Sequence, residues 1–243
     1  MIATATWNGT VSVWDRKSFS LLYQGKHPGD KNVRILSLAS DNCVITGGRS
    51  LAMFENIGEG WGLAKHVEER VTDIAIDGRL AVVGTGDELK QFNIQTHTYV
   101  DDIPQLPVRV AKLAFSYPLV FAVGDHMWGG VKIWDITTGL QVGETLLGVL
   151  RFQHIHINKH VLIVSWDDIN DNQSTDEDEK TSSVFIYDLQ QVKEGPVSDS
   201  RCLKKQIEIP GGDIAAISSN TTSLFVCMGK GNKVVVMDFW NVL

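Results

Sequence analysis

The sequence predicts an all-β protein built from repeated four-stranded units, on the basis of three observations. A short alternation of apolar and polar residues, ending in a large residue followed by an acid or amide, recurs along the chain. Short β-branched runs, most of which reach a glycine, lie between the copies. No window shows the 3.6-residue apolar period of an amphipathic helix. Together these patterns favour strands joined by turns.

The alternating pattern defines a repeat of about forty residues. Its large residues stand 40, 38, 42, 53 and 50 residues apart, and insertions lengthen the last two intervals. A second pattern, with apolar residues at the first, fourth and sixth positions, precedes each copy after the first. The alternating pattern occupies residues 11–15, 51–55, 89–93, 131–135, 184–188 and 234–238.

Four strands per forty residues is the arrangement typical of a β-propeller blade. The expected units lie within one domain, 1–243, and the first and last of them each lack one strand. We therefore expect five to six blades that form an incomplete ring or belong to a longer chain. The units cover about 2–25, 32–67, 70–105, 108–149, 151–210 and 213–243, with an acidic insertion at 167–180.

Several repeats resemble WD40 repeats. Trp14-Asp15 and Trp134-Asp135 match the Trp-Asp pair, and Val110–Ser116 matches the first strand of such a repeat. The resemblance covers nearly the whole chain and implies a WD40-like propeller that binds proteins. The Gly-His pair of the family is absent, and Gly25-Lys26-His27 comes nearest to it. The family's hydrogen-bonded tetrad therefore cannot be assigned to residues of this chain.

The charge distribution argues against nucleic acid as a partner. The net charge is −7, and the segment 167–179 holds seven acids and no base, so the rest of the chain is neutral. Nucleic-acid binders depend on neutralising phosphates. No apolar run is long enough to cross a membrane, and the three cysteines lack the spacing of a disulfide framework. We expect a cytoplasmic location, with the nucleus as the alternative.

No motif of a hydrolase, metalloprotease or nucleotide-binding enzyme occurs, so we expect no catalysis and no cofactor. His154, His156 and His160 have a spacing that would allow a metal site. The alternative is structural, because His156 occupies a position where the other units place alanine or serine. We expect no metal there.

The acidic insertion allows three interpretations. Oxygen-bearing residues from Asp168 to Glu179 follow the ligand spacing of a calcium loop, but Gln173 stands where that loop requires glycine. Ser174 and Thr175 precede several acids, the pattern of an acid-directed phosphorylation site. The third interpretation is a charged, solvated loop.

Five arginines share one region of the predicted blades. Three stand one residue before the first apolar position of a unit's first strand. A fourth stands one residue after that position in another unit, and the fifth follows the glycine pair of the second strand in that unit. If the units are blades, all five approach one opening, where guanidinium groups suit carboxylates or phosphates. They are Arg34, Arg49, Arg70, Arg109 and Arg151. In the alternative, structural interpretation, these arginines cap strand ends or pair with the neighbouring acids Glu68, Glu69 and Asp73.

Arg34 and Arg49, the latter in the run Thr46-Gly47-Gly48-Arg49, resemble the arginine pair of the F-box/WD substrate receptors of ubiquitin ligases. In that family the pair grips phosphorylated degrons. No F-box occurs in this sequence, so a ligase role would need other segments. Trp128 lies at an expected loop tip and is a candidate apolar anchor.

The sequence thus predicts a non-catalytic scaffold that binds a peptide or partner domain, with an acidic or phosphorylated segment favoured. Substrate recognition within an F-box-type ubiquitin ligase and a purely structural coat subunit are the alternatives. The sequence does not determine the oligomeric state.

Overall fold

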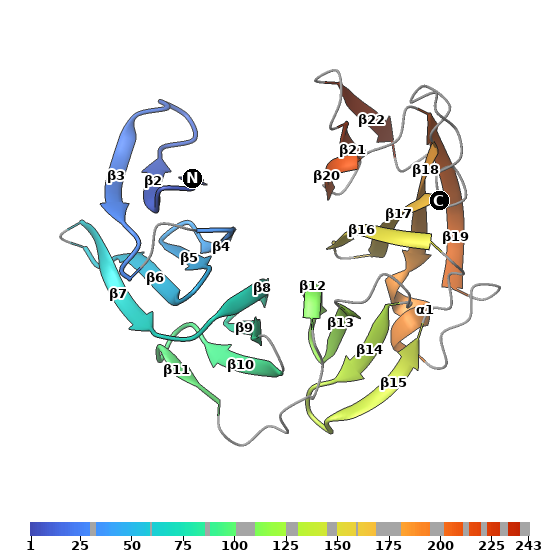
Figure 1. Cartoon of the computed structure of the whole chain (residues 1–243), viewed down its shortest axis with the longest axis horizontal. Coiled ribbons are helices and arrows are strands. Elements are labelled where there is room, and N and C mark those ends of the chain that lie inside the picture. The colour runs from blue at the N-terminus through green and yellow to red at the C-terminus, as the bar shows by residue number, and fades with distance from the viewer. Residues whose placement is uncertain are drawn as a thin grey trace. The chain divides into compact units, whose positions relative to one another are not determined.

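In the computed structural model, the described residues form six antiparallel β-sheets and one short helix (Figure 1). The side chains of 150–153, 167–168 and 210 are not described. The structure describes all residues except 30–32, 59, 86–87, 101–109, 125–130, 145–149, 159, 169–180, 195–201, 211–213, 220–222, 229–232 and 239–243.

The first sheet has three strands and the next two have four each, in chain order within each sheet. The first sheet comprises β1 (Ile2–Ala5), β2 (Thr10–Trp14) and β3 (Leu21–Lys26); the second β4 (Ile35–Ser40), β5 (Cys43–Gly47), β6 (Leu51–Asn56) and β7 (Trp61–Val67); and the third β8 (Val71–Asp77), β9 (Leu80–Thr85), β10 (Leu89–Asn93) and β11 (Thr98–Tyr99).

Two further four-stranded sheets and a final three-stranded one follow in the same order. They comprise β12 (Val110–Ser116), β13 (Leu119–Gly124), β14 (Lys132–Asp135) and β15 (Leu140–Glu144); β16 (Leu150–Ile157), β17 (Val161–Asp168), β18 (Thr181–Asp188) and β19 (Leu203–Pro210); and β20 (Ile214–Ser219), β21 (Ser223–Met228) and β22 (Val234–Asp238). The predicted all-β class with repeated four-stranded antiparallel units is confirmed, while a propeller formed by these sheets stays a prediction.

The chain divides into two compact units. The first contains residues 1–120 and 136–139, and the second contains 121–135 and 140–243. The candidate site described below lies in the first unit. The predicted single domain of 1–243 stays a prediction.

The central strands of the second sheet are buried on both faces. In β6, Leu51 and Met53 pack against the third sheet, whereas Ala52 and Phe54 pack against the first sheet. Neighbouring side chains of a strand point to opposite faces. A strand between two other sheets therefore needs apolar residues at consecutive positions, as this run has.

In two of the repeat patterns, the acid or amide at the end closes the turn to the following segment. Asp15 accepts hydrogen bonds from the N–H groups of Lys17 and Ser18 at 2.9 and 2.7 Å. Asn93 does the same for Gln95 and Thr96 at 2.9 and 3.1 Å. These are Asx turns, in which a side-chain oxygen replaces a backbone acceptor.

A one-turn helix, α1 (Leu189–Lys193), directly follows β18, although the sequence shows no helical apolar period there. Asp188 caps it, accepting from the N–H groups of Gln190 and Gln191 at 2.9 and 3.2 Å. The repeat pattern predicts the acid at the end of the strand, which is Asp188. The residues after it form a helical turn in which Leu189 and Val192 are buried.

In the first unit, carboxylates of β8 link the third sheet to β12 and to the turn after it. Asp73 accepts a hydrogen bond from the Leu113 N–H at 2.7 Å, and Asp77 accepts one from the Tyr117 N–H at 2.8 Å. Each bond joins residues 40 positions apart, which is one repeat. Burial raises the pKa of Asp73 above its ordinary value, although Lys112 and the backbone donors oppose this.

The turn after β2 predicts a stabilising substitution. Phe19 has a φ of 55°, and the corresponding residue of a later turn, Gly139, has a φ of 71°. The left-handed conformation costs a residue with a side chain about 1–2 kcal/mol, and 69% of Phe19 is exposed. Glycine relieves this strain but loses more entropy on folding, which offsets part of the gain, so we expect Phe19→Gly to raise the free energy of unfolding by about 0.5–1 kcal/mol.

Urea unfolding measures this gain, and Phe19→Ala is the control, because alanine keeps the strain of the left-handed conformation. Equal stability of the two variants would contradict the explanation.

Asp73 predicts a pH-dependent difference between two variants. Asp73→Ala leaves the buried Leu113 N–H without its acceptor and should cost about 1–3 kcal/mol. Asp73→Asn keeps an acceptor oxygen and removes the buried charge, so we expect stability at pH 7 at least equal to that of the wild type. A raised folded-state pKa means that the wild type gains stability relative to Asp73→Asn as the pH falls through that pKa. Urea unfolding at a series of pH values from about 7 down to about 4, near the ordinary pKa of aspartate, tests both; a difference between wild type and Asp73→Asn that stays constant over this range argues against a raised pKa.

Candidate functional site

The backbone at Gly47 and Gly48 brings three of the predicted arginines to one end of the sheets. The Arg34 N–H donates to the Gly47 carbonyl at 3.0 Å, and the Val71 N–H donates to the Gly48 carbonyl at 2.8 Å. Arg49 directly follows this pair, and Arg70 directly precedes Val71. The attachment points of Arg34, Arg49 and Arg70 therefore meet at one short segment.

Glycine is needed at position 47 because another strand passes close by. A Cβ atom added to Gly47 would lie 2.9 Å from Cγ1 of Val71 and 3.3 Å from Cδ1 of Ile35. Such distances are shorter than ordinary van der Waals contact, so a side chain would push β8 and β4 away. The glycine thus permits the approach that gathers the arginines.

All three arginines are exposed. The guanidinium group of Arg34 lies over the ring of Trp7, 5.5 Å from the ring centroid. Trp7 is 66% exposed in the turn between β1 and β2. This cation–π contact helps to orient a planar donor group on an exposed side chain.

Sequence reasoning missed Trp7. Its turn is held by Asn8, whose Oδ1 accepts from the Thr10 N–H at 3.2 Å and from Thr10 Oγ1 at 2.8 Å. The available signal was a large aromatic residue directly before the Asn8-Gly9 turn, where it cannot enter the core.

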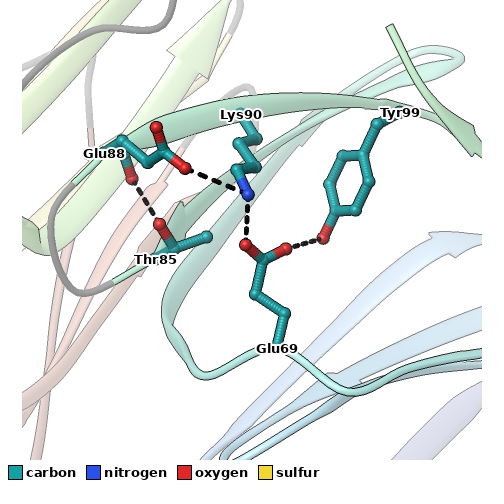
Figure 2. Close-up of polar contacts among 5 residues, drawn as sticks. All are labelled: Glu69, Thr85, Glu88, Lys90 and Tyr99. Carbon is teal, nitrogen blue, oxygen red and sulfur yellow. Dashed lines mark hydrogen bonds and ion pairs between the residues drawn. The ribbon is translucent and has the colours of Figure 1, made fainter. Parts of the chain in front are cut away.

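Two of the acids that could neutralise the arginines are engaged elsewhere. Figure 2 shows Glu69 bound to Lys90 and Tyr99. Asp73 is buried and accepts the Leu113 N–H. The structural interpretation, in which Glu69 and Asp73 pair with the arginines, is therefore wrong for these two acids.

The remaining predicted contact residues are not placed with these three. Arg151 lies in β16, paired in register with Asp167, and its side chain is not described. Arg109, Trp128, Ser174 and Thr175 lie outside the described residues, as does most of the acidic insertion. Their predicted roles stay predictions.

In the second unit, the predicted histidine cluster joins the first strands of two sheets, β16 and β20. His154 Nε2 lies 2.7 Å from the Ile214 carbonyl oxygen, and His156 Nε2 lies 3.0 Å from Ser219 Oγ. Asn158 also donates to Ser219 Oγ, at 3.0 Å. These side chains link β16 to β20, while His160 is exposed. Among the described residues, no group of three or more metal-ligating side chains comes together.

Within the described part of the chain, no helix has the length and apolar character needed to span a membrane.

Comparisons with known proteins give a likeness of structure alone. No family model matches the chain, and no curated protein matches it. The chain is similar to the computationally designed Ika8 protein, with a TM-score of 0.65 and 18% identity over 97% of this chain and 67% of that chain. The designed Ika4 protein matches 71% of this chain and 92% of its own length at 16% identity, with a TM-score of 0.49. At 18% identity, the likeness to Ika8 concerns the fold alone.

The His156 contact predicts a loss of stability in acid. Burial lowers the pKa of His156 below its ordinary value. A lowered pKa means that the unfolded chain binds the proton more readily than the folded chain. The stability that neutral His156 contributes is therefore complete above pH 6.5 and is lost as the pH falls through the lowered pKa. We expect the wild type to lose more free energy of unfolding between pH 7 and pH 5 than His156→Gln does. Chemical unfolding at both pH values measures this. The exposed His160→Gln is the control, and an equal effect of both substitutions would count against a role of burial.

Proposed function

We propose that this chain is a non-catalytic protein-interaction module of the WD40-like propeller type that binds an acidic or phosphorylated peptide segment. One observation supports this most directly: Arg34, Arg49 and Arg70 are attached around the Gly47-Gly48 segment, at one end of the sheets, with exposed side chains. A guanidinium group presents several donors in a planar fork that matches carboxylate and phosphate oxygens. Three such groups suit a doubly charged phosphate better than a single carboxylate.

The neighbouring contacts support the same ligand chemistry. The guanidinium group of Arg34 lies over the Trp7 ring, and Arg34 is exposed. Glu69 and Asp73 are held by other partners, so neither removes the positive charge of the arginines. The ligand would bind on the end of the sheets that carries the turns before β4 and β8.

The test is binding of the whole chain to a phosphoserine peptide library and to the same library after phosphatase treatment. We expect binding of the phosphorylated library that Arg34→Gln combined with Arg49→Gln weakens about tenfold or more. Hydrogen bonds to charged groups contribute about 1.5–3 kcal/mol each, and 1.4 kcal/mol is a factor of ten. Fluorescence anisotropy of a selected peptide gives the affinity, and circular dichroism verifies the fold.

The matched control is Arg16→Gln combined with Arg79→Gln. Both residues are exposed and lie in turns at the opposite end of the sheets, after β2 and β8. This variant loses the same charge, and it should bind as the wild type does. Equal weakening by both double variants would indicate general electrostatic attraction. Binding that ignores both the phosphate and the arginines would overturn the proposal and favour a structural scaffold.

A further inference from the structure

Glu69 lies at the centre of a half-buried polar cluster next to Arg70 (Figure 2). Its two carboxylate oxygens have different partners: Lys90 Nζ contacts Oε1, and the Tyr99 hydroxyl donates to Oε2 at 2.7 Å. Lys90 also pairs with Glu88 Oε1 at 3.0 Å and lies 5.6 Å from the centroid of the Tyr99 ring. The side chains of Glu69 and Lys90 are only 21% and 24% exposed. The carboxylate is therefore held on both sides.

These partners come from the same sheet and fix the direction of the carboxylate. Lys90 lies in β10 and Tyr99 in β11, whereas Glu69 lies in the connection between β7 and β8. The contact with Glu69 raises the pKa of Lys90, so the ammonium group stays charged beside it. Tyr99 is held un-ionised and acts as a donor, because burial and Glu69 both raise its pKa.

Glu69 is the neighbour of Arg70 in the chain, so the direction of its carboxylate affects Arg70. Glu69 directly precedes Arg70, and consecutive Cα atoms are about 3.8 Å apart, so a released glutamate could reach the arginine. Such a pair would occupy the guanidinium donors that an anionic ligand needs. Among the described residues, no ion pair involves Arg70 in the present arrangement.

We propose that Lys90 and Tyr99 are positioning residues that hold Glu69 away from Arg70 and so keep Arg70 available to an anionic ligand. This inference rests on the proposed function and concerns the same site. Neutralising Lys90, by substitution or by acetylation, releases Glu69, which then competes with the ligand for Arg70. The polar cluster thus determines how strongly the site attracts anions without touching the ligand.

Two variants release Glu69 in different ways. Lys90→Met removes the cation, and Tyr99→Phe removes one hydrogen bond while leaving the net charge unchanged. We expect each to weaken binding of the selected phosphoserine peptide about two- to fivefold, which is the range for a new ion pair at a solvent-accessible site. Adding Glu69→Gln to either variant should restore binding, because glutamine carries no charge to compete.

The matched control separates competition from a change in overall charge. Lys90→Met with Glu69→Gln and Lys90→Met with Glu88→Gln have the same net charge. Only the first removes the acid that adjoins Arg70, so only the first should restore the affinity. Equal recovery in both double variants would show that overall charge governs the effect and would overturn the inference.

A second readout does not depend on peptide affinity. In ¹H–¹⁵N NMR spectra, the Nε–H signal of Arg70 should shift in Lys90→Met and return in the double variant with Glu69→Gln. An unchanged Arg70 signal in Lys90→Met means that Glu69 does not move to the arginine, and the inference is then wrong. Thermal unfolding followed by circular dichroism verifies that every variant is folded.

Failure of this inference is distinguishable from failure of the proposed function. If the wild type does not bind the phosphoserine peptides, the proposed function fails whatever the NMR spectra show. If the wild type binds and Arg70→Gln weakens binding, but Lys90→Met and Tyr99→Phe do not, the proposed function stands and the positioning role of Lys90 and Tyr99 is excluded.

Discussion

Burial of the central strands on both faces is the constraint on which the described structure depends. In β5, Ile45 packs toward the third sheet, whereas Val44 packs toward the first, and neither is exposed. A single sheet with two apolar faces is unstable in water, so each central sheet needs a neighbour on either side. For the second sheet, the preceding and the following repeat supply these neighbours, and its strand pattern is the consequence.

The same constraint moves polar chemistry to the strand ends. Charged side chains in β5 or β6 would be buried between sheets without water, which is costly unless each finds a partner. Asp73 is a buried acid that has such a partner, since it accepts a hydrogen bond from the Leu113 N–H in β12. Arg34, Arg49 and Arg70 stand where strands begin or end and can remain hydrated. The candidate site is therefore confined to the connections.

The sequence could predict the features that arise within a single repeat, namely its strands and turns. The strand alternation and turn-closing acids such as Asp15 follow from neighbouring residues, and the all-β class follows with them. The shared placement of Arg34, Arg49 and Arg70 follows from their position in the repeat. Contacts across sheets could not be predicted. The stacking of Trp7 on Arg34 joins the first two sheets, and its geometry depends on how two turns approach. The helical turn after Asp188 depends on burial of Leu189 and Val192, which the repeat pattern does not determine.

The acids beside the arginines illustrate why sequence proximity is a poor guide to pairing. In the run Glu68-Glu69-Arg70, an ion pair between neighbours is the simplest expectation. Glu69 instead turns toward the sheet, where Lys90 and the Tyr99 hydroxyl satisfy both of its oxygens. Partial burial strengthens these contacts, because the effective dielectric there is lower than in water. An exposed pair with Arg70 would be screened and would hold two long side chains in one geometry for little gain. The carboxylate therefore prefers the sheet, and a charged side chain at the strand end stays available to bind.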